Sequence, residues 1–178
     1  QLMRNQDNLP SKGDKVAISS KYVLSKDPFK LTLKNTTTNK LDEITLSKYT
    51  PDLQITKYTE LPTAYAVPIR NKRLMEALQR HGFIFHQSDY KKIENIEYYV
   101  IESFRESSRA NRTSRKISLT VKTEQKRLEN YALFPVNQKG GNALAVFLEP
   151  QSKYGLTRYK DMNLISVPNS NYSILRIL

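Results

Sequence analysis

The chain has 178 residues, which is enough for one domain with a sizeable core and a small additional segment. Its 29 Lys and Arg outnumber its 17 Asp and Glu, so the formal net charge is +12, and such a chain attracts polyanions: nucleic acid, anionic lipid or anionic wall polymer. It contains no cysteine, which excludes disulfides, thiolate metal sites and thiol chemistry. No apolar run approaches the roughly 20 residues of a transmembrane helix, and we expect any export signal to lie upstream of Gln1.

The N-terminal third predicts a linker followed by a β-hairpin. Residues 1–14 are polar and contain Pro10 and Gly13, which favours a flexible lead-in. Residues 15–59 hold the strand patterns and predict a β-rich segment that packs on or precedes the main domain. Apolar residues alternate with polar ones in an outgoing and a return strand, at Phe29, Leu31 and Leu33 and then at Ile44 and Leu46. A further strand is expected around Leu53 and Ile55.

Residues 60–178 predict the main module, which begins with a strand, a helix and another strand. Tyr65 and Val67 indicate a strand that Pro68 ends. The pattern of 71–81 predicts a helix, with Gly82 just past its end, because its apolar residues recur at helical spacing. Residues 83–85 then predict a buried strand, and the whole passage has the length of a crossover unit.

The second half of the chain predicts five more strands. They are expected around 98–101, 117–121, 131–133, 164–167 and 174–177. Many short strands with few helices are typical of an α+β domain. The predicted fold class is therefore α+β: a mixed β-sheet with two or three short helices and a β-rich N-terminal segment.

The stretch 137–159 predicts a buried helix at the centre of the module. Gly140 and Gly141 break the chain, and Asn142 is expected to cap a helix. The run 143–148 is apolar on all sides, which is typical of a helix buried on most faces, and Pro150 ends it. Gly155 is expected to close the following turn in the left-handed conformation.

This stretch also carries a family resemblance. The helix start Asn-Ala-Leu-Ala at 142–145 and the turn Leu-Glu-Pro-Gln-Ser at 148–152 resemble the region after the catalytic domain of bacterial zinc carboxypeptidases of the carboxypeptidase A type. The segments 61–68 and 171–176 resemble the first and last parts of the same C-terminal module.

The resemblance implies a non-catalytic accessory domain of an exported bacterial protein, located at the cell surface or outside the cell. Zinc is then expected only in an upstream catalytic domain, and this segment needs no cofactor. The upstream peptidase domain of the same chain would be one partner. An anionic cell-wall polymer or a peptide would be another.

The sequence offers no convincing catalytic or metal-binding residues. Zinc carboxypeptidases bind the metal through a His-x-x-Glu pair and a distant His, but His81 and His86 are the only histidines and neither begins such a pair. We expect His81 to satisfy carbonyls at a helix end. Glu102, on a strand, is expected to face solvent or to pair with an arginine. Glu149, Gln151 and Ser152 are expected to bind backbone in a tight turn.

The basic run 105–127 is the best binding candidate. It contains eight basic residues against two acidic ones, half of the excess charge of the chain. Residues 107–114 lack apolar anchors and predict an exposed loop, where arginine can form forked bonds to phosphates or carboxylates. The candidate polyanion-binding residues are Arg105, Arg109, Arg112, Arg115 and Lys116.

Three alternatives to this interpretation remain open from the sequence. The basic run can equally be a solvated loop without a ligand. The chain can be a stand-alone basic module that binds nucleic acid, although no recognition helix or ribonucleoprotein motif supports this. It can also be an enzyme with an unrecognised site, although no acid–base pair stands out.

Overall fold

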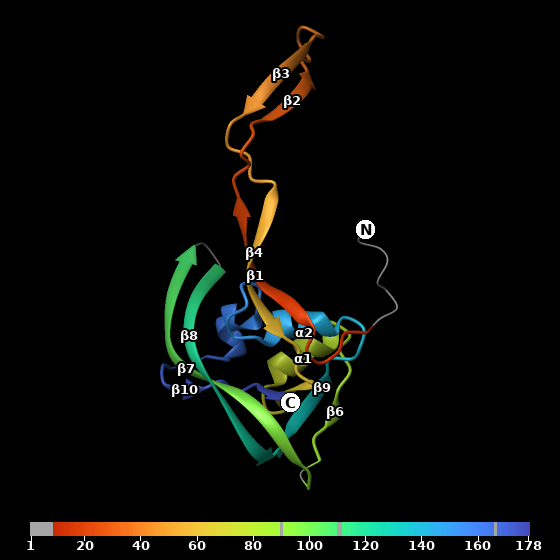
Figure 1. The fold of residues 1–178 in the computed structure, drawn as a ribbon, viewed down its shortest axis with the longest axis vertical. Helices are drawn as coiled ribbons and strands as arrows, with labels where there is room; N and C mark the ends of the chain where they lie inside the picture. Colours follow the sequence, from red (N-terminus) through yellow and green to blue (C-terminus); the bar gives the residue numbers. More distant parts are fainter. Residues whose placement is uncertain (1–8, 90, 110–111, 166) are drawn as a thin grey trace. The chain divides into compact units, whose positions relative to one another are not determined.

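The computed structural model describes residues 9–89, 91–109, 112–165 and 167–178 (Figure 1). The chain divides into two compact units. Unit 2 is Ser20–Lys57, and unit 1 consists of the chain up to Ser19 together with Tyr58–Leu178.

Unit 1 is built on a seven-stranded sheet. In the order β10-β7-β11-β5-β9-β6, neighbouring strands are hydrogen-bonded, and β8 pairs with β7 outside this path. The strands are β5 (Ala64–Pro68), β6 (His86–Gln87), β7 (Ile93–Arg109), β8 (Arg112–Arg127), β9 (Tyr131–Pro135), β10 (Ser170–Asn171) and β11 (Leu175–Ile177). The α+β class is confirmed, with strands dominating over two short α-helices.

The sheet is antiparallel in every described pair, and in this respect the prediction of a mixed sheet was wrong. The passage from β5 through α1 (Lys72–Arg80) to β6 was expected to form a crossover unit from its length. Both strands instead pair antiparallel with β9, one on each side of it. Residues 83–85 are not a strand either: Phe83 is buried, Ile84 is exposed, and pairing begins only at His86.

Helix α1 matches its prediction closely. The side chain of Asn71 accepts a hydrogen bond from the backbone N–H of Leu74 and caps the first turn. Leu74 and Leu78 are fully buried on one face. Gly82 follows the helix with φ +80°, a conformation that favours glycine.

Helix α2 (Gly141–Leu148) forms the predicted buried segment but starts two residues earlier than expected. Gly140, in the left-handed conformation, takes the N-cap position that we assigned to Asn142, and no side chain caps this end. Position 141 requires glycine because the backbone of Val136 lies close to it: a Cβ at this position would be 1.8 Å from the carbonyl oxygen of Val136. Gly155 has φ −72°, so the prediction of a left-handed conformation at this residue was wrong.

Short 3-10 turns η1 (Leu156–Arg158) and η2 (Lys160–Met162) follow α2. The strand predicted at 164–167 is absent from the described residues of this segment: Leu164 and Ile165 are buried in the core without strand pairing. The strand predicted at 174–177 is confirmed as β11.

The core of unit 1 lies on both faces of the central strands. Tyr65 and Val67 of β5 belong to the cluster that contains the buried residues of α1 and α2. Ala64 and Ala66, which alternate with them, belong to a second cluster with Leu133. The central strands are therefore covered on both sides, which fixes their register.

Unit 2 contains the predicted hairpin. Strands β2 (Phe29–Lys34) and β3 (Leu41–Leu46) pair antiparallel, with Leu31 opposite Ile44. Strands β1 (Lys15–Val23) and β4 (Asp52–Glu60) form a separate two-stranded sheet and carry the chain between the units. None of the residues from Ser20 to Lys57 is buried.

The basic run folds as a hairpin of two long strands, so the prediction of a loop at 107–114 was wrong. Ser107 pairs with Ser114 and Arg109 with Arg112, while residues 110–111 lie outside the described residues. We call the part of the hairpin formed by residues 103–109 and 112–118 the basic ribbon. The sequence lacked the usual strand signal because a two-stranded ribbon of this kind has no need of an apolar row along its full length.

Candidate functional site

The structure places two of the predicted polyanion-binding residues together at the base of the basic ribbon. Arg105 on β7 and Lys116 on β8 are direct cross-strand partners, and both are exposed. They line an open groove of about 450 Å³, together with Ser103, Ser118 and Gln151. We call this the cationic groove.

A β-bulge in β7 shapes this groove. Ile101 pairs with Leu119 and Ser103 pairs with Ser118, so Glu102 is an extra residue without a register partner. Because of the extra residue, Ile101 and Phe104 both turn toward the core although they are three positions apart. Ser103 and Arg105 are thereby left on the exposed face.

The charges at the groove are unusual for a sheet. Like charges directly opposite each other destabilise an antiparallel pair, yet Arg105 faces Lys116, and neither has an ion-pair partner in the described part of the chain. Of the nearby acids, Glu106 pairs with Lys160 at 3.6 Å and Glu124 with Lys126 at 3.5 Å. Two exposed cations therefore lie on paired positions without an ion-pair partner among the described residues.

Glu102 borders the groove and faces solvent, one of the two outcomes that we predicted, and no described arginine pairs with it. Its carboxylate accepts hydrogen bonds from the hydroxyls of Thr120 and Ser118, the latter at 2.8 Å. Both hydrogen bonds lower the pKa of Glu102, and the one from Thr120 has the larger effect. The carboxylate is thus held ionised on the side of the groove away from the ribbon tip.

The other three predicted residues are known by their backbone pairing alone. Arg109 is the register partner of Arg112, and Arg115 is the partner of Glu106. Their side chains lie outside the described part of the structure. By strand alternation, positions 105, 109, 112 and 116 fall on one face of the ribbon, and position 115 falls on the other.

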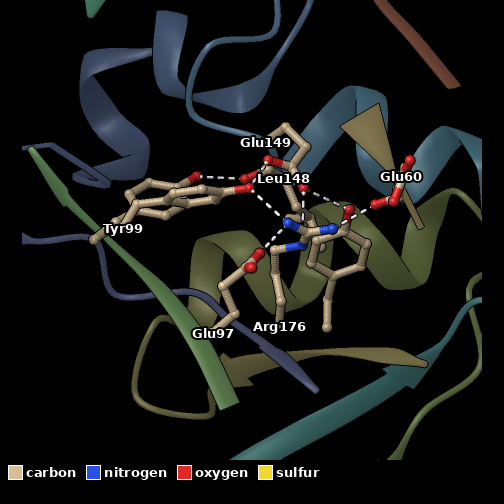
Figure 2. A network of polar contacts seen from close by, with 8 residues as sticks. Glu60, Glu97, Tyr99, Leu148, Glu149 and Arg176 are labelled. Carbon is tan, nitrogen blue, oxygen red and sulfur yellow. Dashed lines mark hydrogen bonds and ion pairs between the residues drawn. The ribbon is translucent and has the colours of Figure 1, made fainter. Parts of the chain in front are cut away.

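A second polar cluster is buried in unit 1 (Figure 2). Glu149, immediately after α2, accepts hydrogen bonds from the hydroxyls of Tyr65 at 2.8 Å and Tyr99 at 2.7 Å. Arg176 of β11 forms ion pairs with Glu149, at 3.4 Å, and with Glu97. The carboxylate of Glu149 was expected to bind backbone in a tight turn, and it instead joins side chains from three strands, β5, β7 and β11.

Burial dominates the electrostatics of this cluster. It raises the pKa of Glu149, while Arg176 and the two tyrosine hydroxyls act in the opposite direction. Burial and the nearby Glu149 also raise the pKa values of Tyr65, Tyr99 and Tyr172. Burial lowers the pKa of Arg176, but Glu149, Tyr99, Tyr65 and Glu97 together outweigh it and leave that pKa raised.

The hydrogen bonds of this cluster connect the C-terminal residues of the chain to the ends of β4 and α2. The Arg176 guanidinium also donates to the carbonyl oxygen of Glu60, and the Tyr172 hydroxyl donates to the carbonyl oxygen of Leu148 at 2.8 Å. Sequence reasoning missed the cluster because its members are scattered from residue 60 to residue 176 and no local pattern links them. Most of the donors and acceptors satisfy one another, and Arg176 Nε, which has no hydrogen-bond partner, lies 3.4 Å from the Glu149 carboxylate, which is the arrangement of a structural network.

The remaining candidates have local structural roles. His81 has its Nδ1 2.8 Å from the carbonyl oxygen of Ala77, the helix-end contact that we predicted. Ser152 accepts from the backbone N–H of Tyr154 within the turn, as expected, whereas Gln151 donates to the carbonyl oxygen of Ile117 on β8. The described residues contain no group of three or more His, Asp or Glu that could hold a metal ion.

No protein-family model, curated protein or solved structure matches this chain. Among the described residues, no helix has the length and apolar character that crossing a bilayer requires. The cationic groove is therefore the feature from which a function can be proposed.

Proposed function

We propose that this chain is a non-catalytic accessory module of an exported bacterial zinc carboxypeptidase-like protein, and that its basic ribbon binds an anionic polymer of the cell wall. The observation that carries the binding role is the exposed pair Arg105 and Lys116, which face each other without a carboxylate partner in the described part of the chain. The accessory role is supported by the resemblance of residues 61–178. Zinc and catalysis then belong to an upstream peptidase domain.

Binding of an anion would relieve the repulsion within the groove. A phosphate or carboxylate between the two cations replaces a repulsive contact by two charge-assisted hydrogen bonds. At physiological ionic strength the screening length is about 8 Å, so the overall charge of +12 attracts a polymer while residues in direct contact decide where it binds.

The ribbon suits a polymer without bases better than it suits a single-stranded nucleic acid. Single-strand binders stack bases on exposed aromatic rings. The described aromatic residues of β7, which are Tyr98, Tyr99 and Phe104, all pack on the two core clusters. The described part of the ribbon therefore presents cations and hydroxyls and offers no stacking surface.

The binding role can be tested with purified poly(glycerol phosphate) teichoic acid in a salt titration by isothermal calorimetry. Removing both charges with R105Q and K116Q should weaken binding by about 100-fold at low salt, because each lost charge-assisted contact is worth about tenfold. The salt dependence should also become shallower.

A matched control removes two charges elsewhere. Arg70 and Lys139 are exposed, and R70Q with K139Q changes the net charge by the same amount. This variant should retain nearly all affinity. Equal losses of affinity in both variants would show that the binding is non-specific charge attraction. Tighter binding of duplex DNA than of teichoic acid would favour the nucleic-acid alternative.

The accessory role has a separate test. The gene that encodes this chain should also encode a zinc carboxypeptidase domain upstream of Gln1. An unrelated domain at that place would refute the accessory role and leave the polymer-binding role intact.

A further inference from the structure

We infer that the cationic groove is a subsite for one phosphate group of a phosphate-bearing polymer, held by Arg105, Lys116 and the hydroxyl of Ser103. This inference rests on the proposed polymer-binding role and narrows the ligand from anionic polymers in general to those that carry phosphate.

The donor groups that line the groove indicate which residues would bind the phosphate. Of the polar groups that line it, Ser118 donates to Glu102 and the amide nitrogen of Gln151 donates to the carbonyl oxygen of Ile117. The guanidinium of Arg105, the ammonium of Lys116 and the hydroxyl of Ser103 have no hydrogen-bond partner within the described residues. Three donors of three kinds thus remain for a ligand.

The arrangement of these donors favours phosphate over carboxylate. A planar carboxylate is satisfied by the two parallel N–H groups of one arginine. Arg105 and Lys116 lie on different strands, and Ser103 lies two residues from Arg105 on the same face. Donors that approach from several directions match the tetrahedral oxygens of a phosphate, to which lysine binds as a point charge.

Glu102 sets the direction in which a polymer leaves the groove. Its carboxylate borders the groove on the side of Ser118 and Thr120 and repels a second phosphate there. The opposite direction leads along the ribbon to the register pair Arg109 and Arg112. Positions 109 and 112 are four residues further along the ribbon than 105 and 116, about 14 Å, and a polymer spans this distance while a free phosphate ion does not.

The test compares an anionic polymer that carries phosphate groups with one that carries carboxylates. Linear polyphosphate and poly-L-glutamate are titrated into the whole chain, and backbone and arginine side-chain signals are followed by NMR. Polyphosphate should shift the signals of Ser103, Arg105 and Lys116, and S103A should weaken polyphosphate binding several-fold while leaving poly-L-glutamate binding unchanged. E102Q should strengthen polyphosphate binding, because it removes the repulsive charge.

The outcomes separate this inference from the proposed function. If R105Q with K116Q weakens both polymers equally and S103A weakens neither, the ribbon binds polyanions but the phosphate subsite is refuted. If neither polymer distinguishes R105Q with K116Q from the control R70Q with K139Q, the proposed function fails together with the inference. Inorganic phosphate alone should shift the same signals at much higher concentration, and shifts confined to other residues would overturn the assignment.

Discussion

The two units of this chain show what strand patterning achieves and what it does not. Both contain antiparallel hairpins with alternating apolar residues. In unit 1 the sheet packs against α1 and α2, and residues such as Phe134 and Leu144 are completely buried. In unit 2 no residue from Ser20 to Lys57 is buried, and Leu33 and Ile44 of the β2–β3 hairpin remain about half exposed. Alternation is enough to pair strands, but a core requires a second surface.

The sharpest way to test this difference is to truncate one apolar residue in each unit. Phe134→Ala should lower the free energy of unfolding by about 3–5 kcal/mol, because the residue is fully buried. Ile44→Ala should change it by less than about 0.5 kcal/mol, because its site is already in contact with water. Urea denaturation measures both, and similar losses would show that unit 2 has a core of its own.

The buried cluster should show the next largest effect. Tyr99→Phe removes a hydroxyl that donates to Glu149 and accepts from Arg176 at 3.0 Å. Hydrogen bonds to charged groups are worth about 1.5–3 kcal/mol, and unit 1 should lose about that much stability. Tyr22→Phe in unit 2 is the matched control, because that side chain is exposed. Equal, negligible losses would show that the cluster does not stabilise unit 1.

Alkaline pH should destabilise unit 1 through the same cluster. The pKa values of Tyr65, Tyr99 and Tyr172 are raised in the folded state above the ordinary value of 10.0. Their contribution to stability is complete below pH 10 and is lost as the pH rises further, because the unfolded chain then releases protons that the folded one retains. Denaturation curves from pH 8 to about pH 11 should show the loss, and it should be smaller in Tyr99→Phe.

Amide hydrogen exchange should reveal the smallest differences, residue by residue. Amides in β2 and β3 should exchange much faster than those in β5 and β9, because a two-stranded hairpin opens without unfolding a core. Mass spectrometry after proteolysis reports each segment. Equal protection in the two hairpins would mean that the β2–β3 face is covered in solution.

The sequence by itself determined the elements whose signal is local. The hairpin at Phe29–Leu46, the helix that Asn71 caps and the buried helix before Pro150 all follow from periodicity, capping and chain-breaking residues near one another in the chain. The same reasoning identified Arg105 and Lys116 as candidate residues from charge alone, although it placed part of the basic run in a loop.

Only the tertiary structure decided the features that join distant residues. Strand order separated β5 from β6 by β9, because antiparallel pairing with β9 satisfies the backbone of both strands. The bulge at Glu102 and the register of β7 with β8 placed Arg105 against Lys116. The hydrogen-bond partners of Glu149 lie on strands up to 84 residues away. A buried carboxylate is costly unless donors contact it, and only the tertiary fold brings these distant donors to it.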